Sequence, residues 1–318
     1  MTRRASGRVA LAFCVVVATF GASAFGDEAE IEAEIEAESG SGLRSIAARA
    51  YQGGEISFDY VPTTDGLGSL ATSASTSIGA PSFIPGQFFL LTPSFEWREV
   101  DAPRLNRIAN ETATLYKAGA TLGYMAPLSS SLTFRFAASV DWRGDGKASA
   151  RQSTRYGGVG MCVLESSERW KWLFGVYYSD ANEWKLAPIG GAVWTIREDL
   201  TATLCFPSPR VSKRAWRDAE SPENELWAYL GLGLGGYSGV FEPWRREGRI
   251  LGDAATARER DFRIGVGAER KTETKFGYAF ETGASFLRKY EVESLVGERW
   301  REGRRPEPTL YLKTNLKF

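Results

Sequence analysis

Two-residue alternation of apolar side chains is the feature that most constrains this chain of 318 residues. Successive side chains of a β-strand point to opposite faces, so an alternating row places its apolar members on one face. The clearest rows are 56–60, 132–142, 170–178, 226–234, 262–268 and 276–286. Within these rows, the residues between the apolar ones are mostly small or charged, as at Gly231, Gly233 and Arg263. The chain is therefore predicted to be all-β, with two-faced strands.

The last ten residues, Thr309 to Phe318, form another such row and end the chain on an aromatic residue. One interpretation is a half-buried terminal strand of a soluble sandwich. The other, which we favour, is the closing strand of an outer-membrane barrel. In that interpretation Leu316 and Phe318 are the signal that the barrel-assembly machinery recognises during biogenesis.

The N-terminal region has the features of an export signal. A basic start and a short apolar run are followed by small residues around Ala24, which predicts a signal peptide over residues 1–26. Phe13 precedes Cys14 where a lipoprotein site requires a small residue, so Cys14 is interpreted as part of the apolar run. Residues 27–50 are acidic and predict a flexible lead-in, with binding to a partner as the alternative.

No later window offers the roughly 18 uninterrupted apolar residues of a membrane helix, which leaves a soluble exported protein or a barrel. The 34 glycines, and the 10 Trp, 12 Tyr and 18 Phe, favour the barrel. A formal net charge of zero argues against nucleic acid as a partner. We expect the barrel to be surrounded by outer-membrane lipid, and we leave its oligomeric state open.

The chain contains no histidine. This excludes a Ser-His-Asp triad, a Cys-His pair and an HExxH zinc site, and with them the barrel enzymes that depend on histidine. We expect no enzymatic activity, cofactor or metal; Glu269 and Glu281 could do acid–base work only if they were adjacent and desolvated. Cys162 and Cys205 leave one disulfide possible.

Connection lengths predict the topology. Tight connections are expected at 126–131, 165–169, 197–200 and 270–275, and long charged loops at 143–153, 238–260 and 287–308. Outer-membrane barrels place short turns at one end and long loops at the other. That arrangement requires two weak segments, 67–79 and 210–216, to be strands. Counting both gives fourteen strands and omitting both gives twelve; we favour fourteen.

Several inner-face positions carry charges. The apolar side chains of each strand are predicted to face outward, so the positions between them face inward. A set of ionisable residues occupies these inward positions: Arg135, Asp141, Arg263, Glu269, Glu281, Lys313 and Lys317. Their mixed sign suits either a salt-bridged plug or the lining of a weakly selective channel. Gly231 to Gly236 matches the spelling of a dinucleotide-binding loop, but it lies in an alternating row with no helix pattern after it, so that interpretation is rejected.

Trp and Tyr residues lie near the predicted strand ends, which is typical of the aromatic girdles of membrane barrels. They are Trp97, Tyr124, Trp142, Trp170, Trp172, Tyr178, Trp227 and Tyr237. Arginines in two of the expected loops would face outside. They are Arg245, Arg246, Arg249, Arg258, Arg260, Arg299, Arg301, Arg304 and Arg305.

From about residue 55 onward the chain resembles an uncharacterised family of outer-membrane β-barrel proteins, a domain of unknown function. The segments that carry the resemblance are 91–95, 115–118, 172–180, 187–195 and 206–210. Ile196 departs from the family, where proline is common. The resemblance implies the fold and the membrane, and it implies no catalytic or binding residue.

The sequence thus predicts a single closed antiparallel transmembrane β-barrel of 12–14 strands over residues 51–318, of the outer-membrane type and located in the cell outer membrane. The expected function is that of a porin-like passive pore for small solutes or a transport-related barrel. The alternative is a plugged, non-conducting barrel that acts as a structural or partner-binding scaffold.

Overall fold

The computed structural model describes residues 51–318 except 83, 85, 103–111, 148–149, 181–184, 242–244, 247–248, 251–254, 273–275 and 296–300. The predicted signal peptide and the acidic lead-in lie outside the described residues. No helix in the described part is long and apolar enough to cross a membrane. Its one α-helix is the short α5 (Ala150–Ser153).

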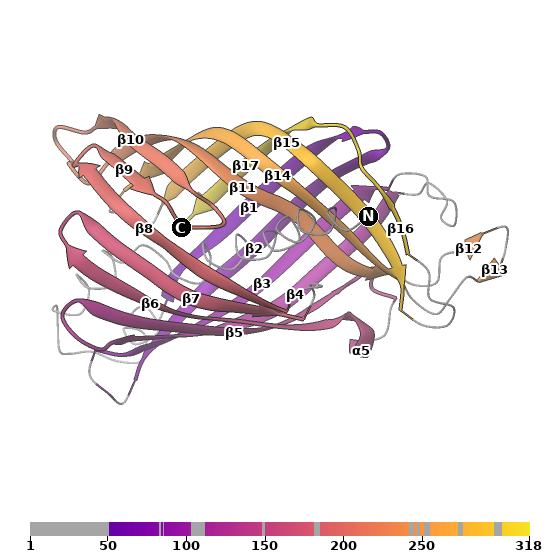
Figure 1. Cartoon of the computed structure of the whole chain (residues 1–318), viewed down its shortest axis with the longest axis horizontal. Coiled ribbons are helices and arrows are strands. Elements are labelled where there is room, and N and C mark those ends of the chain that lie inside the picture. Colours follow the sequence, from indigo (N-terminus) through magenta and orange to yellow (C-terminus); the bar gives the residue numbers. More distant parts are fainter. Residues whose placement is uncertain are drawn as a thin grey trace, which may run out of the picture.

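Fourteen strands form one closed antiparallel barrel (Figure 1). In order around the wall they are β1 (Tyr51–Thr64), β2 (Leu67–Pro81), β3 (Phe88–Asp101), β4 (Thr112–Pro127), β5 (Leu132–Gly144), β6 (Thr154–Ser167), β7 (Trp170–Ser179), β8 (Leu186–Arg197), β9 (Leu200–Thr203), β10 (Arg210–Arg217), β11 (Glu225–Phe241), β14 (Ala255–Lys271), β15 (Gly277–Ser294) and β17 (Thr309–Lys317). The prediction of fourteen strands is confirmed, and the two weak segments are β2 and β10.

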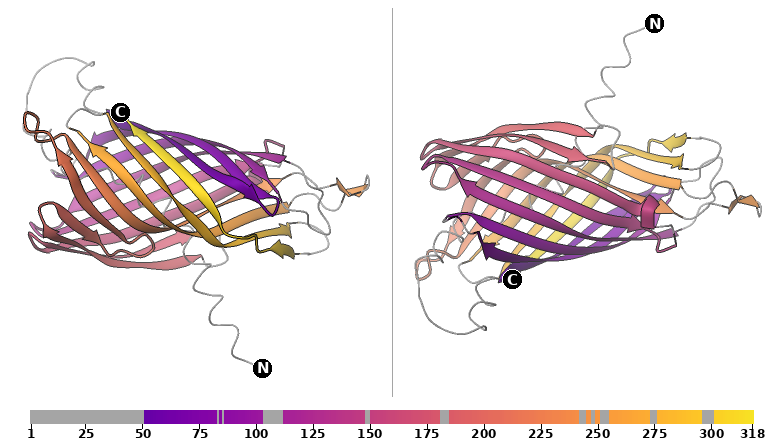
Figure 2. Two further views of the ribbon diagram at one scale, coloured as in Figure 1. Left: turned by 90° about the horizontal axis from the view of Figure 1, so that it is seen from above. Right: turned by 90° about the horizontal axis from the view of Figure 1, so that it is seen from below.

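The barrel closes between its first and last strands. β1 pairs with β17 from Glu55↔Lys317 to Tyr60↔Leu312, and Figure 2 shows the yellow β17 beside the indigo β1. Phe318 completes the junction, because its N–H donates to Gly54 O at 2.9 Å and its O accepts from Gly54 N–H at 2.6 Å. The C-terminal row therefore is the closing strand, as predicted.

The two ends of the barrel differ in their connections. The turn end, where β1 begins and β17 ends, carries the connections 82–87, 128–131, 168–169, 198–199, 218–224 and 272–276. The loop end carries 102–111, 145–153, 242–254 and 295–308, and the shorter connections Asp65–Gly66, 180–185 and 204–209 lie on the same side. The four tight connections predicted from the sequence all lie at the turn end. Three short connections, Asp65–Gly66, 180–185 and 204–209, depart from the expected separation.

The strands reach further toward the loop end than the sequence suggested. Arg258 and Arg260 were assigned to a loop but lie in β14, and Arg260 is buried. Likewise β15 continues to Ser294, and β16 (Arg301–Arg304) pairs with it inside the predicted 287–308 loop. A short hairpin, β12 (Arg245–Arg246) and β13 (Arg249–Ile250), lies beyond the loop end (Figure 2). The strand extensions carry charged residues, which the alternation pattern did not register as strand.

The outer face of the wall is apolar. On β7, Phe174 and Val176 are 54% and 49% exposed, whereas the inward Tyr177 is 2% exposed. Near the turn end, Trp170 stacks on Trp194 and Trp172, with ring centroids 5.1 and 5.6 Å apart. An even number of antiparallel strands, an outward apolar surface and short turns at one end together define a barrel of the outer-membrane type.

Two members of the predicted aromatic girdles face the other way. Tyr237 packs against an apolar cluster inside the barrel, and Trp227 shares the inward alternation of Glu225, to which its Nε1–H donates at 2.7 Å. Both occupy the glycine-bearing inner parity of β11, so the sequence prediction for these two residues was wrong. Trp and Tyr near a strand end can belong to either face, and only the register separates the two cases.

Candidate functional site

The inside of the loop end is filled by apolar side chains. The inward cluster consists of Leu67, Val100, Ala102, Leu115, Phe241, Ala255, Ala257, Tyr290 and Val292, with Ala113 and Tyr237 packed against it. We call this set the apolar cap. Its members come from β2, β3, β4, β11, β14 and β15 and the residue after β3. No member comes from β6 to β10.

The cap forms because the wall contracts at the loop end. The last residues of β11 reach β5, where Val240 pairs with Gly144 and accepts a hydrogen bond from Asp145 N–H at 3.1 Å. This contact closes a ring of β1 to β5, β11, β14, β15 and β17, nine strands, above the ends of β6 to β10. A smaller ring has a smaller diameter, so its inward side chains can meet across the interior.

A β-bulge on β15 turns Tyr290 and Val292 toward the inside of the barrel, where they join the cap. The register to β14 shifts between Arg260 and Phe262, and Leu287 has a φ of 53°. Before it, Glu281 and Ser285 face inward; after it, Arg288, Tyr290 and Val292 do. Arg288 is 1% exposed, and its Nη2–H donates to Leu67 O at 2.9 Å and to Glu259 at 3.2 Å. A bulge inserts one extra residue and so switches the face on which later side chains lie.

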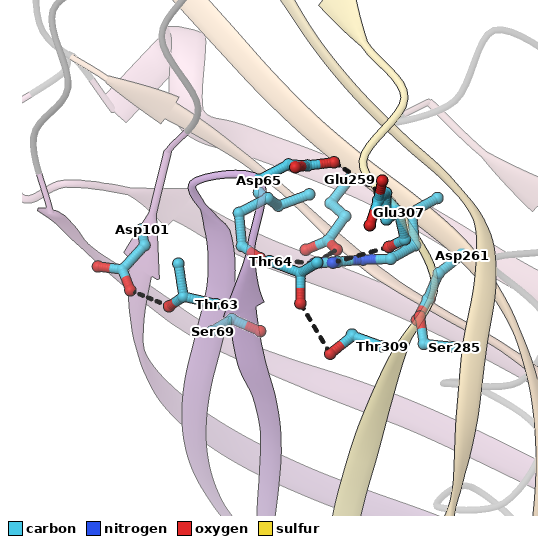
Figure 3. Close-up of polar contacts among 12 residues, drawn as sticks. Thr63, Thr64, Asp65, Ser69, Asp101, Glu259, Asp261, Ser285, Glu307 and Thr309 are labelled. Carbon is cyan, nitrogen blue, oxygen red and sulfur yellow. Dashed lines mark hydrogen bonds and ion pairs between the residues drawn. The ribbon is translucent and has the colours of Figure 1, made fainter.

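Polar contacts tie the loop end together around the β1–β2 turn (Figure 3). Thr64 Oγ1 donates to Thr309 Oγ1 at 2.9 Å, and Glu307 N–H donates to the Asp65 carboxylate at 2.9 Å. Thr63 donates to Asp101 on β3. These hydrogen bonds link the β1–β2 turn to the connection between β15 and β17 and to β3. They therefore stabilise the loop end where the first and last strands meet.

Below the cap lies a belt of buried ion pairs. Arg263 on β14 donates to Asp59 on β1 at 2.9 Å and to Asp261 at 2.8 Å, which joins opposite sides of the junction. On the other wall, Arg98 pairs with Glu96 at 2.8 Å and Arg143 with Asp141 at 2.7 Å. Opposite charges alternate along this belt, so the belt compensates charge in the interior and leaves no strong net field.

A second polar series leads from the belt toward the turn end. The Arg263 guanidinium lies 4.8 Å from the Tyr311 ring centroid, and the Tyr311 hydroxyl donates to Glu281 at 2.6 Å. Tyr229 donates to the other oxygen of Glu281 at 2.9 Å. Arg210 covers the Tyr229 ring at 3.7 Å and donates to Glu269 at 2.7 Å.

The seven charged residues predicted from the sequence lie on the inner alternation, but they do not form one site. Asp141 and Arg263 are in the belt, and Glu269 and Glu281 are in the second series, where Lys317 lies 3.7 Å from Glu269. Arg135 is buried on β5, away from both sets. Lys313, although it faces inward, is exposed, which shows that water reaches the interior near the turn end.

The structure brings together residues that the sequence analysis did not select. Asp59, Arg98, Glu259 and Arg288 are central to the belt and the cap, and the parity of their strands was the only sequence signal available. Glu269 and Glu281 are each held by separate partners, Arg210 and Lys317 for one and two tyrosines for the other. No group of three or more metal-ligating side chains occurs among the described residues. Cys162 and Cys205 are both free thiols.

Comparison with known proteins gives only structural similarities of low score. No protein-family model matches the chain, and no curated protein matches it. LpxR from Salmonella typhimurium is 8% identical with a TM-score of 0.36, over 84% of this chain and 99% of that one. The Pseudomonas putida toluene transporter TodX is 8% identical with a TM-score of 0.32, over 88% and 94%. The siderophore receptor PirA from Pseudomonas aeruginosa is 9% identical with a TM-score of 0.23, over 84% and 80%. Scores this low carry no inference about function.

Proposed function

We propose that this chain is an integral protein of the cell outer membrane. The exposed apolar rows on the outer face support the proposal, because a soluble barrel would bury them against another layer. The stacked tryptophans near the turn end suit a membrane interface. The proposal also includes an export signal at residues 1–26 and a role for Leu316 and Phe318 as an assembly signal. Deleting Phe318 should lower the amount of assembled barrel while leaving export unchanged.

Within that class we propose a plugged barrel that does not conduct along its axis, the alternative kept open by the sequence. One observation carries this proposal: the apolar cap and the ion-pair belt fill the contracted ring at the loop end, with Leu67, Ala257 and Val292 fully buried. An axial channel requires a continuous wetted path, and a packed apolar layer removes it. The barrel then acts as a scaffold, or it exchanges material by a route other than its axis. The absence of histidine further excludes histidine-dependent catalysis.

Planar-bilayer recording tests the closure. Folded wild-type protein should give no discrete single-channel currents. The double variant Tyr237→Ala with Tyr290→Ala, which removes two rings from the cap region, should give them. A matched control, Trp172→Ala with Tyr178→Ala, removes two rings from the outer face and should stay silent. Regular currents from the wild type would overturn the plugged reading in favour of the passive pore.

Gel mobility supplies the check on folding and on the class. A folded membrane barrel resists detergent, so unheated and heated samples of the wild type and of both double variants should migrate differently. Identical mobility before and after heating of the wild type would contradict the membrane-barrel proposal itself, whatever the bilayer recordings show.

A further inference from the structure

The hydrogen-bonded wall is interrupted on one side. β8 pairs with β9 from Val193 to Arg197, and beyond this Leu204 N–H donates to Ala192 O at 2.7 Å and Phe206 N–H donates to Gly190 O at 3.2 Å. β11 pairs with β10 only from Glu225 to Gly231. Among the described residues no strand pairing joins the upper part of β8 to the ten residues of β11 above Gly231. In Figure 1 the strands of the far wall are seen between β8 and β11.

One edge of this interruption is protected by proline. Pro188 lies on the part of β8 that pairs with β7 but not with β9, and Pro207 and Pro209 lie in the connection between β9 and β10. Proline has no N–H to offer to a neighbouring strand, and natural sheets use it to prevent pairing at an exposed edge. This edge is therefore unsuited to receive a β-strand from a protein partner.

The opposite edge carries free backbone groups. Leu232 N–H donates toward this side to Pro209 O at 2.9 Å, and Val240 O accepts from Asp145 N–H at 3.1 Å. Leu234, Gly236 and Ser238 have the same alternation, so their N–H and C=O groups are directed into the interruption. No hydrogen bond reaches them from the described residues on that side. In hydrocarbon each such group costs several kcal/mol unless water or a polar ligand satisfies it.

The outer rim of the interruption is apolar. Large exposed side chains surround it: Leu186, Leu204, Phe206, Leu230 and Leu232. On the inner side Gly231 and Gly233 face inward without side chains, whereas a Cβ at the next inward position, Gly235, would meet Asp261 Oδ1 at 2.1 Å and Arg263 Nε at 2.2 Å. A Cβ added to Gly233 would meet no atom within 4 Å, so the interior beside it is open space. On the next strand Arg263 is the register partner of Gly233, which places the ion-pair belt immediately behind the opening.

We propose that the interruption between β8 and β11 is a lateral binding site for a membrane amphiphile, a molecule with one long hydrocarbon chain and a polar head. The chain lies against the apolar rim in the bilayer, and the head enters beside Gly233 and hydrogen-bonds the free backbone groups of β11. This occupant follows from the rim: a purely apolar molecule leaves the backbone groups of β11 unsatisfied, and a protein strand that filled the interruption would also have to pair with the proline-bearing edge of β8. The inference rests on the proposed membrane location and gives the plugged barrel a route other than its axis.

Photolabelling tests the site with palmitic acid that carries a diazirine on its chain. The full-length protein is reconstituted into phosphatidylcholine vesicles, irradiated and digested, and the labelled peptides are identified. Labels should concentrate on the peptides that contain Leu186, Phe206 and Leu232. Unlabelled palmitic acid should compete with this labelling, whereas hexadecane, which lacks a head group, should compete at least about tenfold more weakly, a difference of ~1.4 kcal/mol. Equal competition by hexadecane would overturn the role of the backbone groups.

Gly233→Phe provides the blocking variant, because its ring fills the open space at the inner rim. It should reduce the specific labelling about tenfold, again ~1.4 kcal/mol. Gly160→Phe is the matched control: Gly160 also has no atom within 4 Å of an added Cβ, but it lies on the outer alternation of β6, away from the interruption. Equal labelling of the two variants would overturn the site, provided that both show the heat-dependent gel mobility of a folded barrel.

The pattern of labels separates failure of this inference from failure of the membrane proposal. Labels spread evenly over the outward residues of all strands would leave the membrane location intact and overturn the lateral site. Absence of labels from every strand, in protein that is folded by gel mobility, would overturn both.

Discussion

The wall from β14 through β15, β17 and β1 to β4 differs from the wall formed by β8, β9 and β10. β14 and β15 are 17 and 18 residues long, whereas β9 and β10 have four and eight. The long wall supplies most of the apolar cap and most of the ion-pair belt. The short wall contributes nothing to the cap and leaves an interruption in the ladder. Strand length therefore decides where the interior is packed and where it is open, because inward side chains can meet only at levels that their strands reach.

The largest expected contrast between the walls concerns charge. Arg263→Ala leaves Asp59 and Asp261 without their buried partner, and removing one member of a buried pair costs about 3–5 kcal/mol. The exposed pair Arg197 and Asp199 at the end of the short wall, 3.3 Å apart, is the control. Arg197→Ala should cost at most about 1 kcal/mol. Urea unfolding in detergent micelles, followed by tryptophan fluorescence, measures both. Equal losses would show that the belt is not held by charge compensation.

A smaller contrast is expected for two inward glycines. A Cβ at Gly283 on β15 would lie 2.0 Å from Ile264 O and 2.6 Å from Gly265 Cα, both backbone atoms that cannot yield easily. Gly283→Ala should therefore cost about 1–3 kcal/mol of unfolding free energy. Gly233→Ala, beside the interruption, should change it by no more than about 0.5 kcal/mol. A large loss at Gly233 would mean that the interior there is filled.

The smallest effect is expected at the proline-protected edge. Pro188→Ala adds one N–H on an edge without a ladder partner, so the unfolding free energy should stay within about 0.5 kcal/mol of the wild type. The physical consequence should instead appear as association, since an unprotected edge can pair with another chain. Native gel electrophoresis or light scattering in detergent measures it. A loss of stability without association would indicate that Pro188 stabilises the wall through packing.

Much of the fold could be read from local pattern. The parity of rows such as Phe174 and Val176 separated the outer face from the inner one, and turn residues separated the strands. The same parity placed Asp141, Arg263 and Glu281 inside. It failed where one residue changes the face, as at the Leu287 bulge, and where charged residues extend a strand, as at Arg258 and Arg260. The prediction from aromatic residues also failed for Trp227 and Tyr237, because a position near a strand end does not determine whether the side chain faces lipid or the interior.

The sequence by itself determined the class of this protein, because a strand's period of two and the lengths of the connections are local properties of the chain. Only the tertiary structure decided which inward groups meet. Asp59 and Arg263, separated by 204 residues, pair because the barrel closes with a particular stagger. The contact of β11 with β5 and the unequal strand lengths then decided which end of the barrel is packed and which side is open. Local sequence patterns do not encode these features, because they depend on distances between residues on opposite walls of the barrel.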